Sequence, residues 1–299
     1  MTVRILQFGA TGQLARELLA QAKDFDVEIT ALSRAEADFI QPRSAASQVA
    51  AHPADLVVIA AAYTAVDLAE SEAELAQAVN VETPAAIAAA CAASGAALVN
   101  VSTDYVFDGN KGRPYAEDDP TGPLNVYGVT KLAGEQAVLA NCTRALVLRT
   151  SWVVSSHGKN FVKTMLRVAA AGNPLKVVDD QFGRPTAARD LARFILGQAE
   201  RLAAAKAGDP VFGLHHFANE GEVSWKGFAE GIFELALGEQ APPVAATTTA
   251  DYPTPARRPL RGTLDTSRLQ HTFGVQPRPW REALAEIIAE LKHEQGSST

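Results

Sequence analysis

The stretch VRILQFGATGQL, residues 3–14, decides the fold class of this chain. Residues 3–8 form an apolar run typical of a buried strand, and Leu14, Leu18 and Leu19 give the following segment the apolar face of a helix. Between them, the two glycines of GATG let the backbone come close to a pyrophosphate, whose negative charge the helix N-terminus stabilises. A plain tight turn can have the same residues, so the prediction of a dinucleotide-binding unit depends on this strand–turn–helix context.

Apolar runs with the length of buried strands recur along the chain and alternate with helical segments. Such alternation predicts an α/β fold of the Rossmann type, a doubly wound parallel sheet covered by helices on both faces. We expect strands at residues 3–8, 27–32, 55–61, 97–103, 145–150 and 213–218, a helix from about Val66 to Ala78, and close helix packing in the Ala-rich stretch 85–93.

The regular alternation stops after Thr150, where Pro-rich or polar segments separate shorter elements. This change predicts a smaller C-terminal lobe that covers the substrate. We assign residues 1–150 and about 186–218 to the nucleotide-binding Rossmann domain, and residues about 151–185 and 219–299 to the substrate-binding lobe.

The composition indicates a soluble globular protein without a general basic surface. The chain has 299 residues, of which 47% are hydrophobic and 20% charged, with a formal net charge of -7 and a pI near 5.4. This balance argues against nucleic-acid or anionic-membrane partners. Because no apolar run reaches the length of a membrane span and the N-terminal segment lacks a leader pattern, we expect a cytoplasmic protein.

The cysteines and histidines do not predict a metal site. Cys91 and Cys142 lack the spacing of metal ligands or redox pairs, and we expect both to be small buried residues. His215 and His216 are adjacent on a predicted strand. Neighbouring strand residues point to opposite faces, so the two histidines are not expected to share a metal ion.

Tyr127 and Lys131 predict a nicotinamide-dependent carbonyl reductase. They stand four residues apart, so on a helix both reach one face and can meet a single bound substrate and cofactor. A nearby ammonium favours phenolate, and we expect Lys131 to lower the pKa of Tyr127 and make its hydroxyl a usable acid. This spacing also occurs by chance. The context that supports a site is the hydroxyl of Thr103 at the end of a predicted strand, together with the preceding glycine turn.

The end of the second predicted strand bears on the choice of cofactor. An acidic residue there binds the ribose hydroxyls of NAD, whereas this chain has Ser33 and Arg34, which suit the 2′-phosphate of NADPH. Asp38 lies close by and keeps NADH possible. Arg34 can equally be an ordinary exposed residue. We therefore predict NADPH, with NADH as the alternative.

Longer motifs resemble the dTDP-4-dehydrorhamnose reductase family, within the extended short-chain dehydrogenase/reductase superfamily. The resemblance runs almost end to end, and its later segments are more specific than the superfamily motif. It is carried by residues 9–14 (GATGQL), 61–67 (AAYTAVD), 102–107 (STDYVF), 123–128 (PLNVYG), 149–152 (RTSW), 160–161 (NF), 180–183 (DQFG), 185–186 (PT) and 252–255 (YPTP).

The resemblance implies NADPH-dependent reduction of the C4 ketone of a small nucleotide-sugar substrate, dTDP-4-dehydro-L-rhamnose, to dTDP-L-rhamnose. Tyr127 would donate a proton to the developing alkoxide, Thr103 would hydrogen-bond the same oxygen, and Lys131 would hold the nicotinamide ribose. The implied cofactor-binding residues are Gly9, Thr11, Gly12, Gln13, Leu14, Ser33, Arg34, Asp38, Phe39, Ala61, Ala62, Tyr63, Thr64, Val66, Tyr127 and Lys131, and the implied substrate-binding residues are Thr103, Asp104, Tyr105, Trp152, Asn160 and Arg258.

Several of the implied substrate-binding residues have alternative roles. Sugar-nucleotide dehydratases of the superfamily carry Asp-Glu where this chain has Asp104 and Tyr105, and without that Glu reduction fits better than water elimination. Tyr105 can also be a structural aromatic residue and Asp104 a turn former. Trp152 can equally pack in the core. Arg258 either neutralises a diphosphate or belongs to a solvated cluster of arginines.

Some members of the resembled family hold a magnesium ion between glutamates at a dimer interface. Glu17 matches the first glutamate, but Arg189 stands at the second position, and a guanidinium does not easily share that space with a cation. We therefore treat magnesium as doubtful and expect no metal site. A homodimer stays possible, with an ion pair between Arg189 and Glu17 of different subunits in place of the metal.

Two other functions share the predicted fold. A regulatory, non-catalytic homologue similar to the beta subunit of methionine adenosyltransferase would bind the cofactor without turnover. The intact Tyr127, Lys131 and Thr103 argue against it. A sugar-nucleotide epimerase would keep its nicotinamide bound and show no net oxidation.

Overall fold

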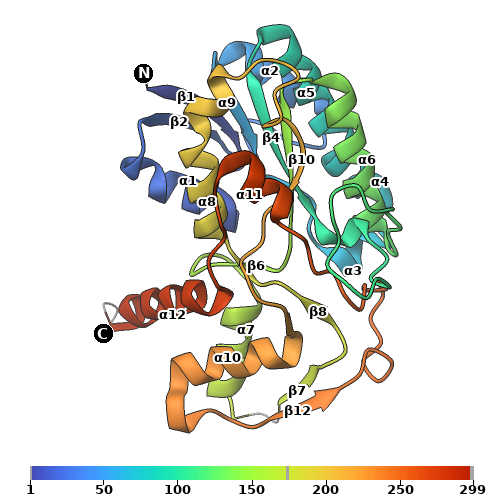
Figure 1. Ribbon diagram of the computed structural model, residues 1–299, viewed down its shortest axis with the longest axis vertical. Helices are drawn as coiled ribbons and strands as arrows, with labels where there is room; N and C mark the ends of the chain where they lie inside the picture. Colours follow the sequence, from blue (N-terminus) through green and yellow to red (C-terminus); the bar gives the residue numbers. More distant parts are fainter. Residues whose placement is uncertain (1, 173–174, 297–299) are drawn as a thin grey trace.

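The computed structural model describes residues 2–172 and 175–296, which form a larger lobe around a parallel sheet and a smaller lobe beneath it (Figure 1). The sheet strands are β1 (Val3–Phe8), β2 (Val27–Leu32), β3 (Leu56–Ile59), β4 (Ala97–Thr103), β5 (Ala145–Thr150) and β10 (Gly213–His216), in the spatial order β10-β5-β4-β3-β1-β2. Each neighbouring pair is parallel. The predicted Rossmann-type sheet is confirmed, although β3 and β10 are shorter than expected.

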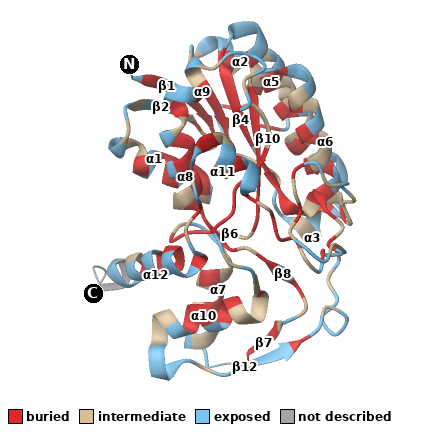
Figure 2. Cartoon of the chain, in the orientation of Figure 1, coloured by how far each residue is buried: buried red, intermediate tan, exposed pale blue. Residues whose placement is uncertain are grey.

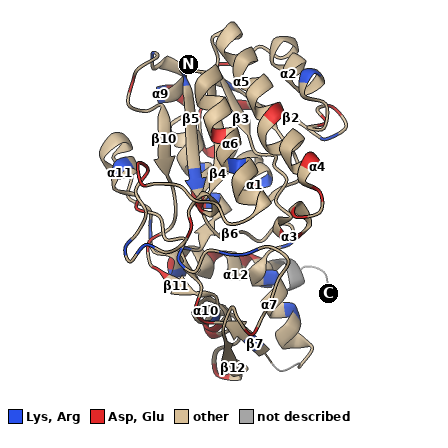
Figure 3. Cartoon of the chain, turned by 90° about the vertical axis from the view of Figure 1, so that its right-hand side faces the viewer, with Lys and Arg blue, Asp and Glu red and all other residues tan. Residues whose placement is uncertain are grey.

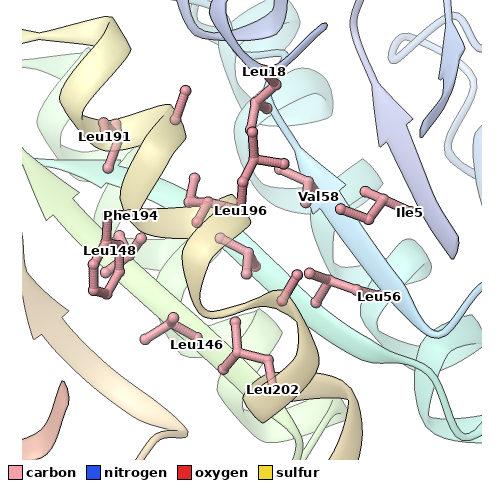
Figure 4. Close-up of a cluster of buried hydrophobic side chains, with 14 of the residues drawn as sticks. Ile5, Leu18, Leu56, Val58, Leu146, Leu148, Leu191, Phe194, Leu196 and Leu202 are labelled. Atoms are coloured by element: carbon pink, nitrogen blue, oxygen red, sulfur yellow. The ribbon is translucent and has the colours of Figure 1, made fainter. Parts of the chain in front are cut away.

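Helices cover both faces of the sheet because successive residues of each strand point to opposite sides. On β1, Ile5 belongs to one apolar core and Leu6 to the other. The first core lies under α1 (Gln13–Gln21), α8 (Ala188–Gly197), α9 (Ala199–Ala204) and α11 (Ser267–Phe273), and the second under α2 (Pro42–Ala51), α5 (Thr83–Ser94) and α6 (Val126–Asn141). Figure 4 shows the first core, in which Leu18 and Phe194 from the helices lie over sheet residues such as Leu148.

One side-chain prediction for α1 is wrong. Leu14 and Leu18 are buried, but Leu19 is 42% exposed. Successive residues of an α-helix are about 100° apart around its axis, so the residue after Leu18 turns away from the sheet. An apolar leucine on the outer face is common and does not disturb the helix.

The helix expected from Val66 to Ala78 is not continuous. The structure has α3 (Val66–Ala69), a turn, α4 (Ala73–Gln77) and then a π-helical turn (Ala78–Glu82) that leads into α5. The Ala-rich stretch lies in α5, as expected. Single π-helical turns inside α-helices are rare and often occur at functional sites.

The smaller lobe has its own apolar core, visible in Figure 2 as buried segments of α7 and α10 below the sheet. Its elements are α7 (Phe161–Ala170), α10 (Trp225–Leu237), α12 (Trp280–Gly296) and the parallel strands β7 (Leu175–Val178) and β12 (Val244–Thr247). Two further short pairs are β6 (Val153–Val154) with β9 (Thr186–Ala187), and β8 (Phe182–Gly183) with β11 (Val223–Ser224).

The chain passes between the lobes more than once. It leaves the sheet after β5, returns through β9 into α8, and leaves again after β10. Later it adds α11 to the sheet core and ends in the smaller lobe with α12. The use of one lobe for the cofactor and the other for the substrate stays a prediction.

No helix of the described residues is both long enough and apolar enough to cross a lipid bilayer. Figure 3 shows that acidic and basic residues are scattered along the elements of both lobes.

Candidate active site

A cavity of about 530 Å³ opens where the sheet strands end. Its walls come from the turn after β1, the segment after β3, the last residues of β4 and one face of α6. Because β1 lies between β2 and β3, the chain direction across the sheet reverses at this point. Open parallel sheets bind their ligands at such a reversal, at the carboxyl ends of the strands.

Most of the predicted cofactor-binding residues line this cavity. They are Gly9, Thr11, Gly12, Gln13, Leu14, Arg34, Asp38, Phe39, Ala61, Ala62, Tyr63, Thr64, Tyr127 and Lys131. Ser33 and Val66 are not among the lining residues. The hydroxyl of Ser33 instead donates a hydrogen bond of 2.8 Å to Glu36, and Val66 begins α3.

The glycine turn has the geometry of a phosphate cradle. Gly9 has a φ of 99°, and a Cβ there would lie 3.2 Å from the Cβ of Ala61, so a larger residue would be strained and crowded. Gly12 is the N-cap of α1, and no described side chain caps that helix. The first amides of α1 are therefore suited to bind a negatively charged group.

The catalytic residues predicted from the sequence lie on α6 and at the end of β4. The side chain of Asn125 caps α6 by accepting a 2.8 Å hydrogen bond from the amide of Gly128. Gly128 packs against the carbonyl of Tyr105, with no room for a Cβ, so α6 comes close to the segment after β4. The hydroxyl of Tyr127 is thereby hydrogen-bonded to the side chain of Thr103.

Burial is the largest influence on the pKa values of Tyr127 and Lys131. It raises the pKa of Tyr127 to about 12, although the hydrogen bond with Thr103 opposes the rise, and it lowers the pKa of Lys131 to about 8. The Lys131 ammonium donates a 2.7 Å hydrogen bond to the carbonyl of Val101. The expected lowering of the Tyr127 pKa by Lys131 is therefore absent here, because desolvation is the larger effect and the ammonium is bonded to β4.

Trp152 and Asn160 lie at the junction of the lobes, outside the cavity lining. Trp152 has a φ of 47° and stacks on Trp225 with ring centroids 3.6 Å apart, which places it at the edge of the smaller lobe's core. Asn160 caps α7, and its amide donates a 2.9 Å hydrogen bond to Gln13 of the glycine turn. Their predicted substrate contacts stay predictions.

Asp104, Tyr105 and Arg258 lie near Tyr127 and, like Thr103, outside the cavity lining. The ring of Tyr105 meets Tyr127 edge-on at 5.7 Å, and its hydroxyl is hydrogen-bonded to Arg258. Arg258 also forms a 2.8 Å ion pair with Asp67. The guanidinium also donates hydrogen bonds to the Thr254 hydroxyl and the Ala256 carbonyl, so several partners hold it near Tyr105.

The comparison with known proteins places the chain in a family. The sequence profile described as "RmlD substrate binding domain" matches residues 3–293. The chain belongs to this family. The predicted family resemblance is confirmed by relatives of nearly the same length.

Among these RmlD-family relatives, the dTDP-4-dehydrorhamnose reductase of Sinorhizobium fredii is 42% identical over 289 residues, covering 96% of this chain and 97% of the relative. The enzyme of the same name from Streptomyces griseus is 45% identical over 290 residues, covering 96% and 94%. The crystal structure of dTDP-4-dehydrorhamnose reductase from Bacillus anthracis in complex with NADP superposes with a TM-score of 0.90 at 32% identity, covering 97% of this chain and 100% of that one.

Arg189 of this RmlD-family chain pairs with Glu17 within one chain, and the ion pair between two subunits stays a prediction. Its Nε lies 3.4 Å from the Oε2 atom of Glu17 in the same chain, which joins α8 to α1, and its other nitrogens contact Glu286 and Glu290 of α12. Among the described residues, no cluster of three acidic, histidine or cysteine side chains is placed to hold a metal ion. Magnesium at this position stays doubtful.

Asn80 was missed by the sequence analysis. It lies in the π-helical turn, accepts a 2.9 Å hydrogen bond from the amide of Tyr63, and donates to the Tyr63 carbonyl and the Thr130 hydroxyl. The backbone of Asn80 also packs against Gly134 of α6, where a Cβ would not fit. Asn80 thus ties the cavity wall after β3 to the helix that carries Tyr127 and Lys131. No local pattern in the sequence indicates such a long-range clamp.

Other lining residues could have been found from the predicted strands. Val101, Ser102 and Thr150 occupy the last positions of β4 and β5, where a parallel sheet presents its ligand-binding edge. The predicted ends of these strands were therefore sufficient to predict that the three residues line the site.

Proposed function

We propose that this RmlD-family chain reduces the C4 ketone of dTDP-4-dehydro-L-rhamnose to dTDP-L-rhamnose with NADPH, as a step of nucleotide-sugar biosynthesis. The observation that carries the proposal is the convergence of the glycine turn, Tyr127 and Lys131 on one cavity. Relatives named dTDP-4-dehydrorhamnose reductase match nearly the whole chain. When bound, the reduced nicotinamide supplies a hydride to the ketone carbon.

The residues around the cavity fit a dinucleotide. The uncapped N-terminus of α1 and the close backbone approach at Gly9 suit its pyrophosphate. Lys131 lies where it can hold a ribose hydroxyl, since it is buried and lines the cavity from α6. We assign the larger lobe to the cofactor and the smaller lobe to the nucleotide sugar, with Trp152, Asn160 and Arg258 at the boundary.

Tyr127 acts as the proton donor in this proposal. Its raised pKa keeps the hydroxyl protonated at neutral pH, and a proton donor must hold its proton until the alkoxide develops. The Thr103 hydroxyl hydrogen-bonds Tyr127 and lies at the end of β4, so it can also stabilise the developing oxyanion.

Arg34 is proposed to select NADPH over NADH. Its side chain is 79% exposed, lines the cavity, and lies 3.6 Å through Nε from the Oδ1 atom of Asp38. A guanidinium so weakly engaged can turn to a 2′-phosphate, because an exposed ion pair contributes about 1 kcal/mol or less. We expect Arg34→Ala to weaken NADPH binding about tenfold or more and NADH binding far less. Competitive titrations measure both constants, and equal losses for the two cofactors would show that Arg34 does not recognise the phosphate.

The test of the function follows the absorbance of the reduced nicotinamide while the protein, NADPH and enzymatically generated dTDP-4-dehydro-L-rhamnose react. We expect a fall that requires the sugar and gives stoichiometric dTDP-L-rhamnose. A protein that binds NADPH without any fall either reduces another keto sugar or is a regulatory homologue. An epimerase would change the sugar without net loss of NADPH.

A further inference from the structure

Asp104 follows Thr103 directly, and its carboxyl group lies behind the Thr103 hydroxyl. The Asp104 residue is 2% exposed. Thr103 Oγ1 donates a 3.0 Å hydrogen bond to Asp104 Oδ1 and accepts one of 3.2 Å from the amide of Tyr105. The Oδ2 atom of Asp104 is buried without a hydrogen-bond partner among the described residues, and Gly262 packs against it with no room for a Cβ.

Among the residues that the structure describes, no cation acts on this carboxyl group. The groups that face it are the hydroxyl of Thr103 and the rings of Tyr105 and Tyr127. The Arg258 guanidinium interacts with Tyr105 and with Asp67. Burial without a counterion raises the pKa of Asp104 to about 7, against the opposing effect of the Thr103 hydrogen bond. Both protonation states are therefore populated near neutral pH.

We propose that Asp104 is a positioning residue that sets the direction of the Thr103 hydroxyl and returns a proton through it to Tyr127. The proposal rests on the reduction described above and gives Asp104 a role other than binding the sugar. A hydroxyl has one proton to donate. When Asp104 is ionised, the Thr103 proton is committed to its carboxylate. When Asp104 is protonated, its own proton points at Thr103 Oγ1, and the Thr103 proton turns toward Tyr127.

The proton balance of the step is closed. Tyr127 gives its proton to the alkoxide of the reduced sugar and becomes a phenolate. Thr103 passes its proton to that phenolate and takes one from Asp104, so the O–H bond of the product replaces the O–H bond of Asp104. The transfer is downhill, because a phenolate is a much stronger base than a carboxylate. Water restores the Asp104 proton after product release, and no electrons move in the relay.

The variant Asp104→Asn tests the role, because an amide can still donate a hydrogen bond to Thr103 but cannot release a proton. In the wild type, activity should fall as the pH rises through about 7, since the working form carries the proton. We expect Asp104→Asn to lower kcat about tenfold or more and to lose the fall near pH 7, so that only the fall from deprotonation of Lys131 near pH 8 remains. The KM for the sugar should stay within about twofold, because a residue that acts only on proton transfer leaves ground-state binding unchanged.

The matched control is Glu117→Gln. Glu117 is also buried and also has a raised pKa, but its carboxylate binds the amide of His216 and not the catalytic pair. This variant should keep the wild-type pH profile. Infrared difference spectra across the same pH range should show a protonated carboxylic acid band that Asp104→Asn lacks. Absence of the band in the wild type would overturn the proposal.

Three kinetic outcomes separate the possibilities. A wild type that does not consume NADPH with the keto sugar overturns the proposed function and the relay together. A turning-over wild type whose fall near pH 7 persists in Asp104→Asn overturns the relay alone. A variant with raised KM for the sugar and unchanged kcat shows that Asp104 binds substrate and is not in the proton path.

Discussion

Tyr127→Phe should lower kcat by about 10²- to 10⁴-fold while NADPH still binds, because the change removes the proposed proton donor and little else. The phenyl ring can keep its edge-on contact with Tyr105 at 5.7 Å, so the packing of α6 against the end of β4 should survive. Steady-state kinetics with the keto sugar measure the loss, and fluorescence titration with NADPH measures the retained binding.

Tyr115→Phe is the matched control for this loss. Tyr115 is also buried, and its hydroxyl also forms a hydrogen bond, donated over 2.6 Å to Asp108, but it does not line the cavity. This variant should turn over at nearly the wild-type rate. A Tyr127→Phe enzyme with comparable turnover would exclude Tyr127 as the acid.

Glu135→Leu should destabilise the fold by about 3–5 kcal/mol, because it leaves a buried charge without its partner. Arg149 of β5 and Glu135 of α6 form two hydrogen bonds of 2.9 and 2.7 Å, and each side chain is 3% exposed. The pair joins α6 to the sheet one turn after Lys131. Urea unfolding followed by circular dichroism measures the free energy of unfolding.

The double variant Glu135→Leu with Arg149→Met tests whether the unpaired Arg149 guanidinium causes the loss of unfolding free energy. Replacing both charges by apolar side chains of similar size removes the unpaired guanidinium, so we expect most of the stability to return. If the single variant lost only about 1 kcal/mol, as for an exposed ion pair, the guanidinium must have reached water. In the single variant, removal of the Glu135 charge should also lower the pKa of Lys131 further, since Glu135 raises it.

The sheet could be predicted from the sequence because its strands are buried on both faces and therefore form uninterrupted apolar runs. The break within residues 66–78 could not. At this break, Glu70 accepts a 2.8 Å hydrogen bond from the amide of Val126, 56 residues further along the chain, and Glu72 accepts one of 2.6 Å from Tyr63, which lies outside the helical segment. A local helical pattern contains no information about such partners.

Some residues of the candidate site could likewise be predicted from local sequence, whereas others depend on contacts with distant residues. Gly9, Tyr127 and Lys131 belong to short motifs with their own physical reason, and the structure brings them to one cavity. Asn80 acts only through residues that are distant in sequence, and the partner of Arg189 is Glu17 of its own chain, on a helix that precedes it by more than half the sequence. Spacing in one sequence could not distinguish that ion pair from one between two subunits.

The repeated passage of the chain between the lobes has a consequence for how this family diverges. The smaller lobe takes its core from segments on both sides of α8 and β10 and from the C-terminal helix. A single recombination point therefore cannot exchange this lobe as a unit between two genes, because each fragment would lack part of the core. We expect the substrate preferences of relatives to have changed by accumulated point substitutions rather than by shuffling of whole modules.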